Sequence, residues 1–567
     1  MTGAELILTL VTCVVLMALV AWVSYVYTRG STQSKDGYFL AGRNLSGLFI
    51  AGSLLLTNLS AEQLIGLNGS AYGFNLSSMA WEVTAAVSTI AMAIIFLPKY
   101  LAGAFTTLPE FLRNRFDPQV QQMSLILFML GYGLVTIPSV LYSGSIAVIK
   151  LFDVPELLGV GQFEALIITV LAIGCVGSVY AIFGGLKAVA VSDTLNGIGL
   201  LIVGILVPLL GLYALGGGSI LDGIATITSE HPEKLNAIGG KGDPTPFGTI
   251  FTGMIMANLF YWCTNQYVIQ RTLAAQNLAE GQKGVLFSGF LKLLVPFFMM
   301  LPGVIAFHLY GAGLTSIDLA YPQLIRDLFP IWLMGFFLAV LLGAVFSSFN
   351  SLLNSAATLF CLDIYTPLKG GKVSEHETVR MAKIVSVIMA IFSFIVAPLL
   401  YFAPEGLWQI IRIFTGFYNI PIVVIVLVGL FSKRIPAIGA KMVIIFHVIA
   451  YGLLKFALDD YVTLHFLHLY ALLFTVEVGI MLLAGYLRPR PDPWVFKKVD
   501  IVDLTPWRYT VPVAFTLFSA VVLIYVLFSP IGLAGNNLGL LFYLINGGVL
   551  LLNVSVWWRA ISTHQNA

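Results

Sequence analysis

The chain alternates long apolar runs with short polar connections along nearly its whole length. Counting the runs that reach the roughly 20 residues needed to cross a bilayer predicts about fifteen membrane-spanning helices. We expect these spans at 3–28, 46–74, 77–101, 120–151, 160–184, 190–216, 248–272, 283–310, 330–366, 378–402, 405–432, 438–457, 463–487, 509–530 and 534–558. The pattern therefore predicts an all-α polytopic membrane protein that forms a single transmembrane domain over residues 1–567.

Two of the predicted spans contain polar interruptions. In the second, GLFIAGSLLL gives way to TNLSAEQ at residues 57–63, and in the seventh, TIFTGMIMA gives way to NLFYWCTNQY at residues 258–267. Small and amide-bearing residues let a membrane helix unwind where neighbours or water satisfy the released backbone groups. The interruptions lie five spans apart, which indicates two five-helix blocks of opposite orientation, 46–216 and 248–432, with additional helices at 438–558. This is the inverted-repeat plan of a transporter; polar patches that only serve helix packing are the alternative.

The composition agrees with a membrane protein and excludes several classes of function. The chain is 59% hydrophobic and 10% charged, with a mean hydropathy of +0.94, whereas soluble domains carry about 25% charged residues. The scattered net charge of +2 does not indicate nucleic-acid binding. The four cysteines show no CxxC spacing, and no nucleophile–base or HExxH pattern occurs, so an enzyme is not expected.

Basic residues predict the orientation in the membrane. They are concentrated in one set of alternate loops, which we take to include Arg43, Arg113, Arg115, Arg271, Lys283, Lys369, Lys383, Lys433 and Arg490. The positive-inside rule then places the N-terminus outside and the C-terminus in the cytoplasm. Short loops without a large external domain favour a bacterial inner (plasma) membrane as the location.

Three charged residues lie inside otherwise apolar spans. They are Glu82, Lys292 and Arg412. An ion at the centre of a bilayer costs about 2.5–3.5 kcal/mol on insertion scales unless a partner or a water-filled cavity receives it. The sequence therefore predicts a polar chamber inside the membrane, with a structural ion pair between Glu82 and Lys292 as the alternative.

The ninth span carries a stripe of hydroxyl and amide residues in GAVFSSFNSLLNSAATLF. For Ser347 and Ser348 we expect a hard-cation site, because such ions need several oxygen ligands and an adjacent unwound helix offers carbonyl oxygens. For the remaining members of the stripe we expect helix packing. These are Ser351, Asn354, Ser355 and Thr358.

Several of these segments are similar to one known family. The segments LTNLSAEQLIGLNGSAYG, ANLFYWCTNQYVIQRTLAAQ, GFLKLLVPFFMMLPG, FSSFNSLLNSAATLFCLDIY and YAIFGGLKAVAVSD resemble the sodium/solute symporter family. They are most similar to its bacterial sodium/galactose transporter and sodium/glucose cotransporter branch, over residues of about 38–460. The resemblance implies a LeuT-like five-plus-five inverted repeat with extra flanking helices.

The resemblance also implies where sodium binds. The matching ligands are the backbone carbonyls of Leu56, Leu59 and Ala344 and the hydroxyls of Ser347 and Ser348. Asp193 matches a family aspartate linked to sodium exit; taken alone, it would be read as a solvated charge at a helix end. Na⁺ is thus expected as the co-transported ion, without an organic cofactor.

Further matching positions imply contacts with a sugar. The polar contacts are Gln63, Glu82, Asn258 and Lys292, the aromatic gate is Tyr261, and the supporting positions are Trp262, Asn58 and Tyr142. This set suits a ring of hydroxyls, because a carboxylate accepts hydrogen bonds, an ammonium donates them and amides do both. An aromatic side chain supplies stacking area for the C–H face of the ring.

The chain also departs from the family pattern around the expected sugar site. Arg412 stands where a glutamine is expected, Ala85 replaces a serine, and Trp81 and Trp408 replace smaller aromatic residues. Arg412 together with Lys292 would favour an anionic sugar, because guanidinium binds carboxylate or sulfonate in a bidentate manner. Alternatively, Arg412 pairs with a carboxylate or donates to neutral hydroxyls, and we place a neutral sugar ahead.

These features together predict a sodium-coupled sugar symporter that imports a hexose-like sugar by alternating access. The alternatives are a sodium symporter for an anionic (acidic or sulfonated) sugar or, further away, for a carboxylate or amino acid. A channel would not need an occluding aromatic gate. The expected partners are a small-molecule sugar and the lipid bilayer, and no nucleic acid; the sequence does not indicate an oligomeric state.

Overall fold

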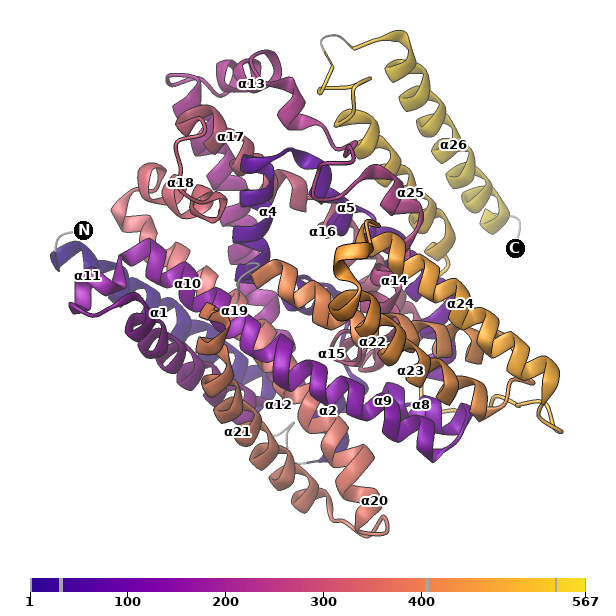
Figure 1. The fold of residues 1–567 in the computed structure, drawn as a ribbon. Helices are drawn as coiled ribbons and strands as arrows, with labels where there is room; N and C mark the ends of the chain where they lie inside the picture. The colour runs from indigo at the N-terminus through magenta and orange to yellow at the C-terminus, as the bar shows by residue number, and fades with distance from the viewer. Residues whose placement is uncertain (1–2, 30–33, 403–406, 536–537, 566–567) are drawn as a thin grey trace.

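The computed structural model describes residues 3–29, 34–402, 407–535 and 538–565; within these ranges the side chains at 35, 180–184, 407–410, 412–413, 459 and 563–565 are not described. The chain folds as a bundle of helices that cross one another at varied angles (Figure 1). The longer helices are α1 (Gly3–Thr28), α3 (Gly47–Asn58), α4 (Ala61–Gly73), α9 (Pro118–Leu130), α10 (Ile137–Phe152), α12 (Gln162–Leu215), α16 (Leu278–Leu293), α17 (Leu301–Tyr310), α19 (Ile331–Phe360), α21 (Glu375–Leu399), α22 (Leu407–Phe431), α23 (Ala437–Gly452), α24 (Phe466–Leu487), α25 (Thr510–Leu527) and α26 (Leu540–Gln565).

Shorter helices connect or extend these. They are α2 (Lys35–Leu40), α5 (Ala80–Val83), α6 (Ala85–Ala91), α7 (Leu97–Ala102), α8 (Leu108–Arg115), α11 (Val154–Leu158), α13 (Ile220–Ser229), α14 (Gly253–Leu259), α15 (Gln266–Leu273), α18 (Ala320–Leu328) and α20 (Thr366–Leu368). Side chains at the N-cap position fix several of the starts: Asp117 accepts from the Val120 backbone N–H at 2.9 Å, and Asn277 accepts from that of Glu280 at 2.8 Å. The helix boundaries therefore follow local sequence signals.

The described part of the chain contains 13 helices long and apolar enough to cross a membrane, or 14 when the bent pair α3–α4 counts as one span. The sequence predicted about fifteen, and the difference is the expected span 248–272. That segment is divided between α14, the π-helical turn Phe260–Thr264 and α15, so neither half is long enough to count. The expected spans 160–184 and 190–216 form the single element α12, which is interrupted at Gly185, where φ is 61°.

The first predicted interruption is present and separates α3 from α4. Helix α3 ends at Asn58, α4 begins at Ala61, and the two helices are bent by 62°. Leu59 has φ −83° and ψ 89°, outside the helical region, and the Ser60 N–H donates to the Asn58 carbonyl at 3.1 Å instead of to the Leu56 carbonyl. The prediction of an unwound segment within 57–63 is confirmed.

The second interruption is also present. Asn265 has an extended backbone (φ −80°, ψ 119°) between the π-helical turn and α15. The hydroxyl of Tyr132 donates to Asn265 Oδ1 at 2.6 Å and accepts from the Tyr267 N–H at 3.2 Å. The hydroxyl of Tyr100 donates to the Cys263 carbonyl at 2.9 Å. Two buried tyrosines therefore satisfy groups that the unwinding releases, which is the requirement for irregular backbone at membrane depth.

One basic residue of the loops has a structural role. Arg115 lies between two membrane spans, as expected, but at the end of α8 and with its side chain fully buried. It donates to the carbonyls of Gly429 (2.7 Å), Ser432 (2.5 Å) and Ile435 (3.3 Å). These carbonyls lie at the C-terminal end of α22, where a cation also interacts favourably with the helix dipole. Arg115 therefore stabilises the end of a neighbouring helix from the connection between two spans.

The last two helices form the edge of the bundle. Figure 1 shows α25 and α26 side by side, with α26 as the outermost helix. Within the apolar window of α26, none of the residues is buried in the protein. The interior of the bundle is formed by the broken helices together with α10, α12, α16, α19 and α22.

Candidate solute and sodium sites

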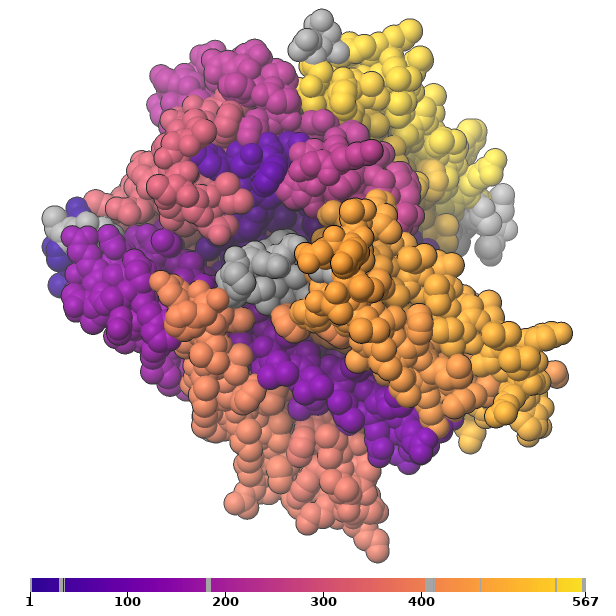
Figure 2. All heavy atoms as spheres, viewed as in Figure 1, coloured from indigo at the N-terminus to yellow at the C-terminus, as the bar shows by residue number. Residues whose placement is uncertain are grey.

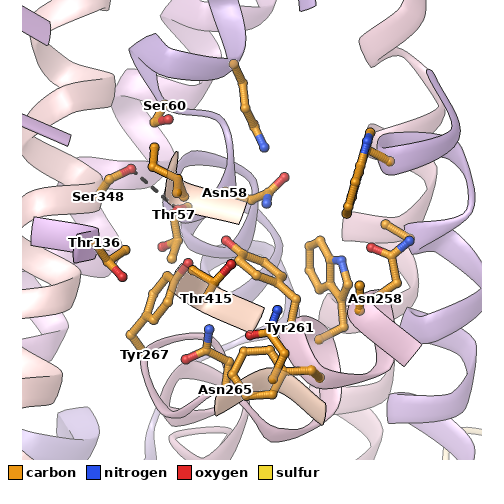
Figure 3. A pocket seen from close by; sticks show the side chains of 18 of the residues that line it. Thr57, Asn58, Ser60, Thr136, Asn258, Tyr261, Asn265, Tyr267, Ser348 and Thr415 are labelled. Carbon is orange, nitrogen blue, oxygen red and sulfur yellow. Dashed lines mark hydrogen bonds between the residues drawn. The ribbon is translucent and has the colours of Figure 1, made fainter. Parts of the chain in front are cut away.

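A cavity of about 100 Å³ lies where the two helix interruptions face each other. Its described lining comes mainly from α3, α4, α5, α6, α10, α14, the π-helical turn Phe260–Thr264, α15, α19 and α22 (Figure 3). The lining residues are Thr57, Asn58, Ser60, Glu62, Gln63, Trp81, Glu82, Ala85, Thr136, Val140, Ala257, Asn258, Phe260, Tyr261, Trp262, Asn265, Tyr267, Ser348, Leu352, Ile411, Thr415, Tyr418 and Asn419. Ligand pockets are usually about 300–1,000 Å³, so lining groups have to move before a sugar-sized molecule fills this one.

Glu82 and Lys292 are paired with each other. Lys292 Nζ donates to Glu82 Oε2, and Gln63 Nε2 donates to Glu82 Oε1 at 3.2 Å. The side chains of Lys292 and Glu82 are 1% and 3% exposed. Glu82 and Gln63 reach the cavity, whereas Lys292 does not belong to its lining and lies behind Glu82, 5.7 Å from the centre of the Trp262 ring. The ion pair that we held as the alternative is therefore present, and one of its members borders the cavity.

Amide and hydroxyl side chains supply most of the other polar groups in the described lining of the cavity. Asn258 Nδ2 donates to the Thr84 hydroxyl at 2.9 Å, which leaves its carbonyl oxygen outside this bond. Gln63 Oε1 and Asn58 Oδ1 are buried acceptors without a hydrogen-bond partner. Unpaired buried acceptors are costly, so a solute that donates hydrogen bonds would be stabilised here.

An aromatic group closes one end of the cavity. The rings of Tyr261 and Tyr267 meet edge to face at 5.7 Å, and Tyr261 contacts Trp262 in the same manner at 5.5 Å. Figure 3 shows Tyr261 between Asn58 and Thr415, with Tyr267 beside it. Of the residues expected as gate and support, Tyr261 and Trp262 thus belong to one aromatic cluster at the interruption of the seventh span, which also contains Tyr267.

Trp81 separates this cavity from a second one. Its ring stacks on Phe466 of α24 with the ring centres 6.3 Å apart and the planes 13° apart. Trp81 also lines the second cavity, of about 470 Å³, together with Gly66 and Ser70 of α4 and with His465. Figure 2 shows α4, in indigo, set back between the pink and orange segments on this face of the molecule. Sequence reasoning did not identify Phe466, because it lies on a helix outside the expected repeats.

Three residues expected to bind the substrate have no described contact with the cavity. Tyr142, on α10, is not among the residues that line the cavity. Trp408 and Arg412 belong to α22, but their side chains lie outside the described residues. For Arg412, on which the anionic alternative depends, the structure therefore gives the position in α22 and no side-chain contact.

Two of the expected sodium ligands, Leu56 and Ser348, are in contact at the interruption between α3 and α4. Ser348 Oγ donates to the carbonyls of Leu56 and Thr57, both at 3.4 Å, and Figure 3 shows the contact with Thr57. Ser347 Oγ is buried without a hydrogen-bond partner. Leu59 and Ala344 are buried in the two elements that meet here. Hydroxyl and carbonyl oxygens are the donor types that hard cations prefer.

Asp193 is not a solvated charge at a helix end. Its side chain is fully buried in α12, where Ser53 Oγ donates to Asp193 Oδ2 at 2.6 Å. Arg271 of α15 donates to Ser53 Oγ at 2.7 Å and to Ser351 Oγ, and its guanidinium lies 3.7 Å from Asp193 Oδ2. Ser351 in turn donates to the Ser347 carbonyl at 2.5 Å. One buried network therefore joins α3, α12, α15 and α19 directly beside the serine pair.

Arg271 was wrongly counted among the loop charges. Helix α15 continues past the interruption, and Arg271 is buried in its last turn. The adjacent Gln270 donates to the Phe39 carbonyl at 2.8 Å and to Thr358 Oγ1 at 3.0 Å, and it accepts from Ser355 at 2.7 Å. Ser355 and Thr358 therefore bind α15 to α19, in agreement with the packing role expected for them. A basic residue four positions after a predicted interruption was the signal available in the sequence.

A model of the sodium:solute symporter family matches residues 38–446. The chain belongs to this family. It is 42% identical over 555 residues to the uncharacterized symporter YidK of Escherichia coli (strain K12), covering 98% of this chain and 96% of that protein. It is 32% identical over 441 residues to the sodium/glucose cotransporter of Vibrio parahaemolyticus, covering 74% and 79%.

The fold is shared with a solved transporter structure. A Na⁺-coupled sialic acid symporter, solved in a substrate-bound outward-open state, superposes with a TM-score of 0.73 at 22% sequence identity, covering 86% of this chain and 98% of that chain. The LeuT-like fold expected from the sequence is confirmed. The protein is thus a multi-pass membrane transporter, a sodium-coupled solute symporter and not an enzyme.

Proposed function

We propose that this symporter carries a neutral, hexose-like polyhydroxy solute together with Na⁺. The observation that carries the proposal is the chemistry of the cavity lining. Lys292 forms an ion pair with Glu82 and does not line the cavity. The charged side chains among the described lining residues are therefore the carboxylates Glu62 and Glu82. Amides, hydroxyls and aromatic rings make up most of the remaining polar surface, which suits hydroxyl groups on a ring.

An anionic sugar is the second candidate, and it depends on Arg412. The described lining contains no Lys or Arg side chain that would bind an anion, whereas a guanidinium facing the cavity would attract one. The sodium/glucose cotransporter among the relatives supports the neutral solute, and the sialic acid symporter shares the fold only. The neutral solute is therefore the stronger proposal.

Sodium would bind between the α3–α4 interruption and α19, with the ligands Leu56, Leu59, Ala344, Ser347 and Ser348. Binding there would hold the interrupted helix against α19 and so stabilise the cavity that α3 and α4 line. By linkage, the solute must raise the affinity for sodium by the same factor. One Na⁺ crossing 100 mV contributes about 2.3 kcal/mol, equivalent to an accumulation of roughly 50-fold. Asp193 and Arg271, next to the serine pair, would act on sodium release.

We also propose the two repeats at 46–216 and 248–432 with the N-terminus outside and the C-terminus in the cytoplasm of a bacterial cell. The two confirmed interruptions lie at equivalent positions of these blocks, which supports the division. The same set of alternate loops still carries most of the basic residues when Arg115 and Arg271 are left out, which supports the orientation. Labelling of single cysteines in the loops of intact cells tests it.

Uptake into proteoliposomes tests the proposed solute. Neutral hexoses and acidic sugars are offered to the purified protein with and without an inward sodium gradient. We expect uptake of a neutral sugar that depends on the gradient, and competition by acidic sugars only at much higher concentration. Preferential uptake of an acidic sugar would select the second candidate, and no sodium-dependent uptake of either class would refute both.

A further inference from the structure

A buried titratable pair lies outside the solute cavity and the serine pair. His447 of α23 and Glu477 of α24 are both fully buried, and His447 Nδ1 lies 2.5 Å from Glu477 Oε1. His447 Nε2 is 2.9 Å from the backbone carbonyl of Gly416 in α22. Two helices that follow the predicted repeats are therefore joined to a helix that lines the cavity. Ionisable residues within a membrane protein are rare and mark functional sites by default.

The geometry requires a proton in this pair. A backbone carbonyl only accepts hydrogen bonds, so the Nε2 atom of His447 must carry a hydrogen. The remaining 2.5 Å contact joins Nδ1 to a carboxyl oxygen, and two lone pairs repel each other at that separation. One proton therefore lies between them, either as imidazolium with carboxylate or as imidazole with carboxylic acid. Both forms have zero net charge, and removing the proton leaves an uncompensated buried carboxylate.

Gly416 is the residue through which this pair reaches α22. A Cβ atom at Gly416 would lie 2.3 Å from Tyr451 Oη and 2.7 Å from Tyr470 Oη, so only glycine allows α23 and α24 to approach this closely. The neighbouring Thr415 lines the solute cavity. The pair therefore contacts α22 at Gly416, while the neighbouring Thr415 of the same helix lines the cavity.

The helical hydrogen bonding of α22 is interrupted close to Gly416. The helix contains Pro421, which has no N–H, so the Phe417 carbonyl lacks its helical hydrogen-bond donor. Proline positions in helices allow bending. Movement of the segment that contains Thr415 therefore depends on whether the contact between His447 and Gly416 persists.

We propose that His447 and Glu477 form a proton-binding site, separate from the sodium and solute sites, that fixes α22 against the C-terminal helices. The bound proton stabilises the arrangement with α22 held. As the pH rises and the proton leaves, Glu477 and His447 Nδ1 repel each other, the contact with Gly416 weakens and α22 moves more freely. Access to the cavity past Thr415 therefore increases with pH.

Other groups near the pair define its electrostatic surroundings. Tyr451 stacks on His447 with ring centres 5.5 Å apart, and the Tyr470 ring lies 6.0 Å from that of Tyr451. The remaining titratable or charged residues on α22, α23 and α24 are Arg412, whose side chain is not described, Tyr418, Lys441, His468 and Tyr486. Helices α9 and α14, which pack against α23 and α24, carry no titratable side chain in their described sequences.

Cysteine labelling at the cavity tests the proposal without knowledge of the solute. Thr415→Cys, made with Cys175→Ser because Cys175 is the exposed native cysteine, is labelled by a maleimide between pH 5.5 and 9 in sodium-free buffer. The same measurement is made with Glu477→Gln, whose amide donates permanently to His447 Nδ1, and with Glu477→Leu. The Glu477→Gln variant should keep the fold. Its labelling rate therefore gives the pH dependence of the cysteine thiol at position 415 itself.

The decisive quantity is the labelling rate with native Glu477 divided by the rate in the Glu477→Gln variant. We expect this ratio to rise by about tenfold or more across the pH range. When one group loses its proton, the equilibrium between the held and the free arrangement of α22 changes by about tenfold per pH unit. The leucine variant, where it folds by size-exclusion chromatography, should be labelled rapidly at every pH. A ratio that stays constant across the whole range overturns the proposal. That result would leave the proposed sugar transport untouched, because no solute is used.

Discussion

The guanidinium of Arg271 lies 3.7 Å from the carboxylate of Asp193, and both side chains are completely buried. Ser53 bridges them, since it accepts from Arg271 Nε and donates to Asp193 Oδ2. The pair connects α15, which follows one helix interruption, to α12, and Ser53 attaches both to α3, which precedes the other interruption. Movement of either interrupted helix must therefore break or carry along a buried ion pair.

Removing one member of this pair should destabilise the protein strongly. Asp193→Ala leaves a buried guanidinium without its counter-charge, and loss of one partner of a buried pair costs about 3–5 kcal/mol. The double variant Asp193→Asn with Arg271→Gln removes both charges and should recover part of this loss. Unfolding in mixed detergent micelles measures both free energies. If the single and double variants lose the same stability, the two charges do not interact.

The pair of Glu82 and Lys292 yields a different prediction, because Glu82 also borders the cavity. Lys292→Ala should lower both expression and uptake, since it leaves Glu82 with Gln63 as its described partner. Glu82→Gln combined with Lys292→Met should restore a folded protein without restoring uptake. Fluorescence size-exclusion chromatography and proteoliposome uptake separate the two effects. Recovery of uptake in the double variant would assign the pair a structural role only.

Ser348→Ala should weaken sodium dependence. The hydroxyl lies against the carbonyls of Leu56 and Thr57, and a hydrogen bond or ligand contact to a charged group contributes about 1.5–3 kcal/mol. The sodium concentration for half-maximal uptake should rise by about tenfold or more, with the order of preferred solutes unchanged. Ser355→Ala on the same helix is the matched control, because Ser355 contacts Gln270 instead. Equal effects of both substitutions would contradict a sodium site at Ser348.

Tyr132→Phe should destabilise the interruption of the seventh span. The substitution removes the hydroxyl that serves Asn265 Oδ1 and the Tyr267 N–H, and leaving buried polar groups unsatisfied costs about 1–3 kcal/mol. Hydrogen exchange of the backbone around Asn265 should accelerate, while α25, at the edge of the bundle, should exchange as in the unaltered protein. Unchanged exchange at Asn265 would show that other groups hold this segment.

Local sequence signals were enough to predict the two interruptions and most of the membrane spans, although several helix ends differ by a few residues, as for α26 (Leu540–Gln565 against 534–558). TNLSAEQ and NLFYWCTNQY are polar segments inside apolar runs, and both unwind where expected. The partners of buried charges could not be predicted in the same way. Arg271 and Arg115 have neighbours like those of loop residues, and only packing against distant helices buries them. Likewise, spacing could not decide whether Lys292 faces Glu82 or a cavity, because the two residues are 210 positions apart.

The contact between Trp81 and Phe466 yields the last prediction. The stacked rings separate the cavity at the helix interruptions from the second cavity, and Trp81 lines both. Phe466→Ala should open the passage between the cavities, because it removes the apolar ring area that holds Trp81 in place; aromatic pairs contribute about 0.5–1.5 kcal/mol beyond their burial. Solute should then exchange faster across this side, so that retention of preloaded solute by the purified protein decreases several-fold.

Phe466→Tyr keeps the ring and is the matched control, since it should retain solute as the unaltered protein does. Filter-binding measurements of solute dissociation in saturating sodium give the rates directly. Faster dissociation with alanine but not with tyrosine would place a residue of α24, beyond the two predicted repeats, in control of access to the transport site. Equal dissociation rates in all three proteins would show that the Trp81 ring is held without Phe466 and that α24 acts only as a scaffold.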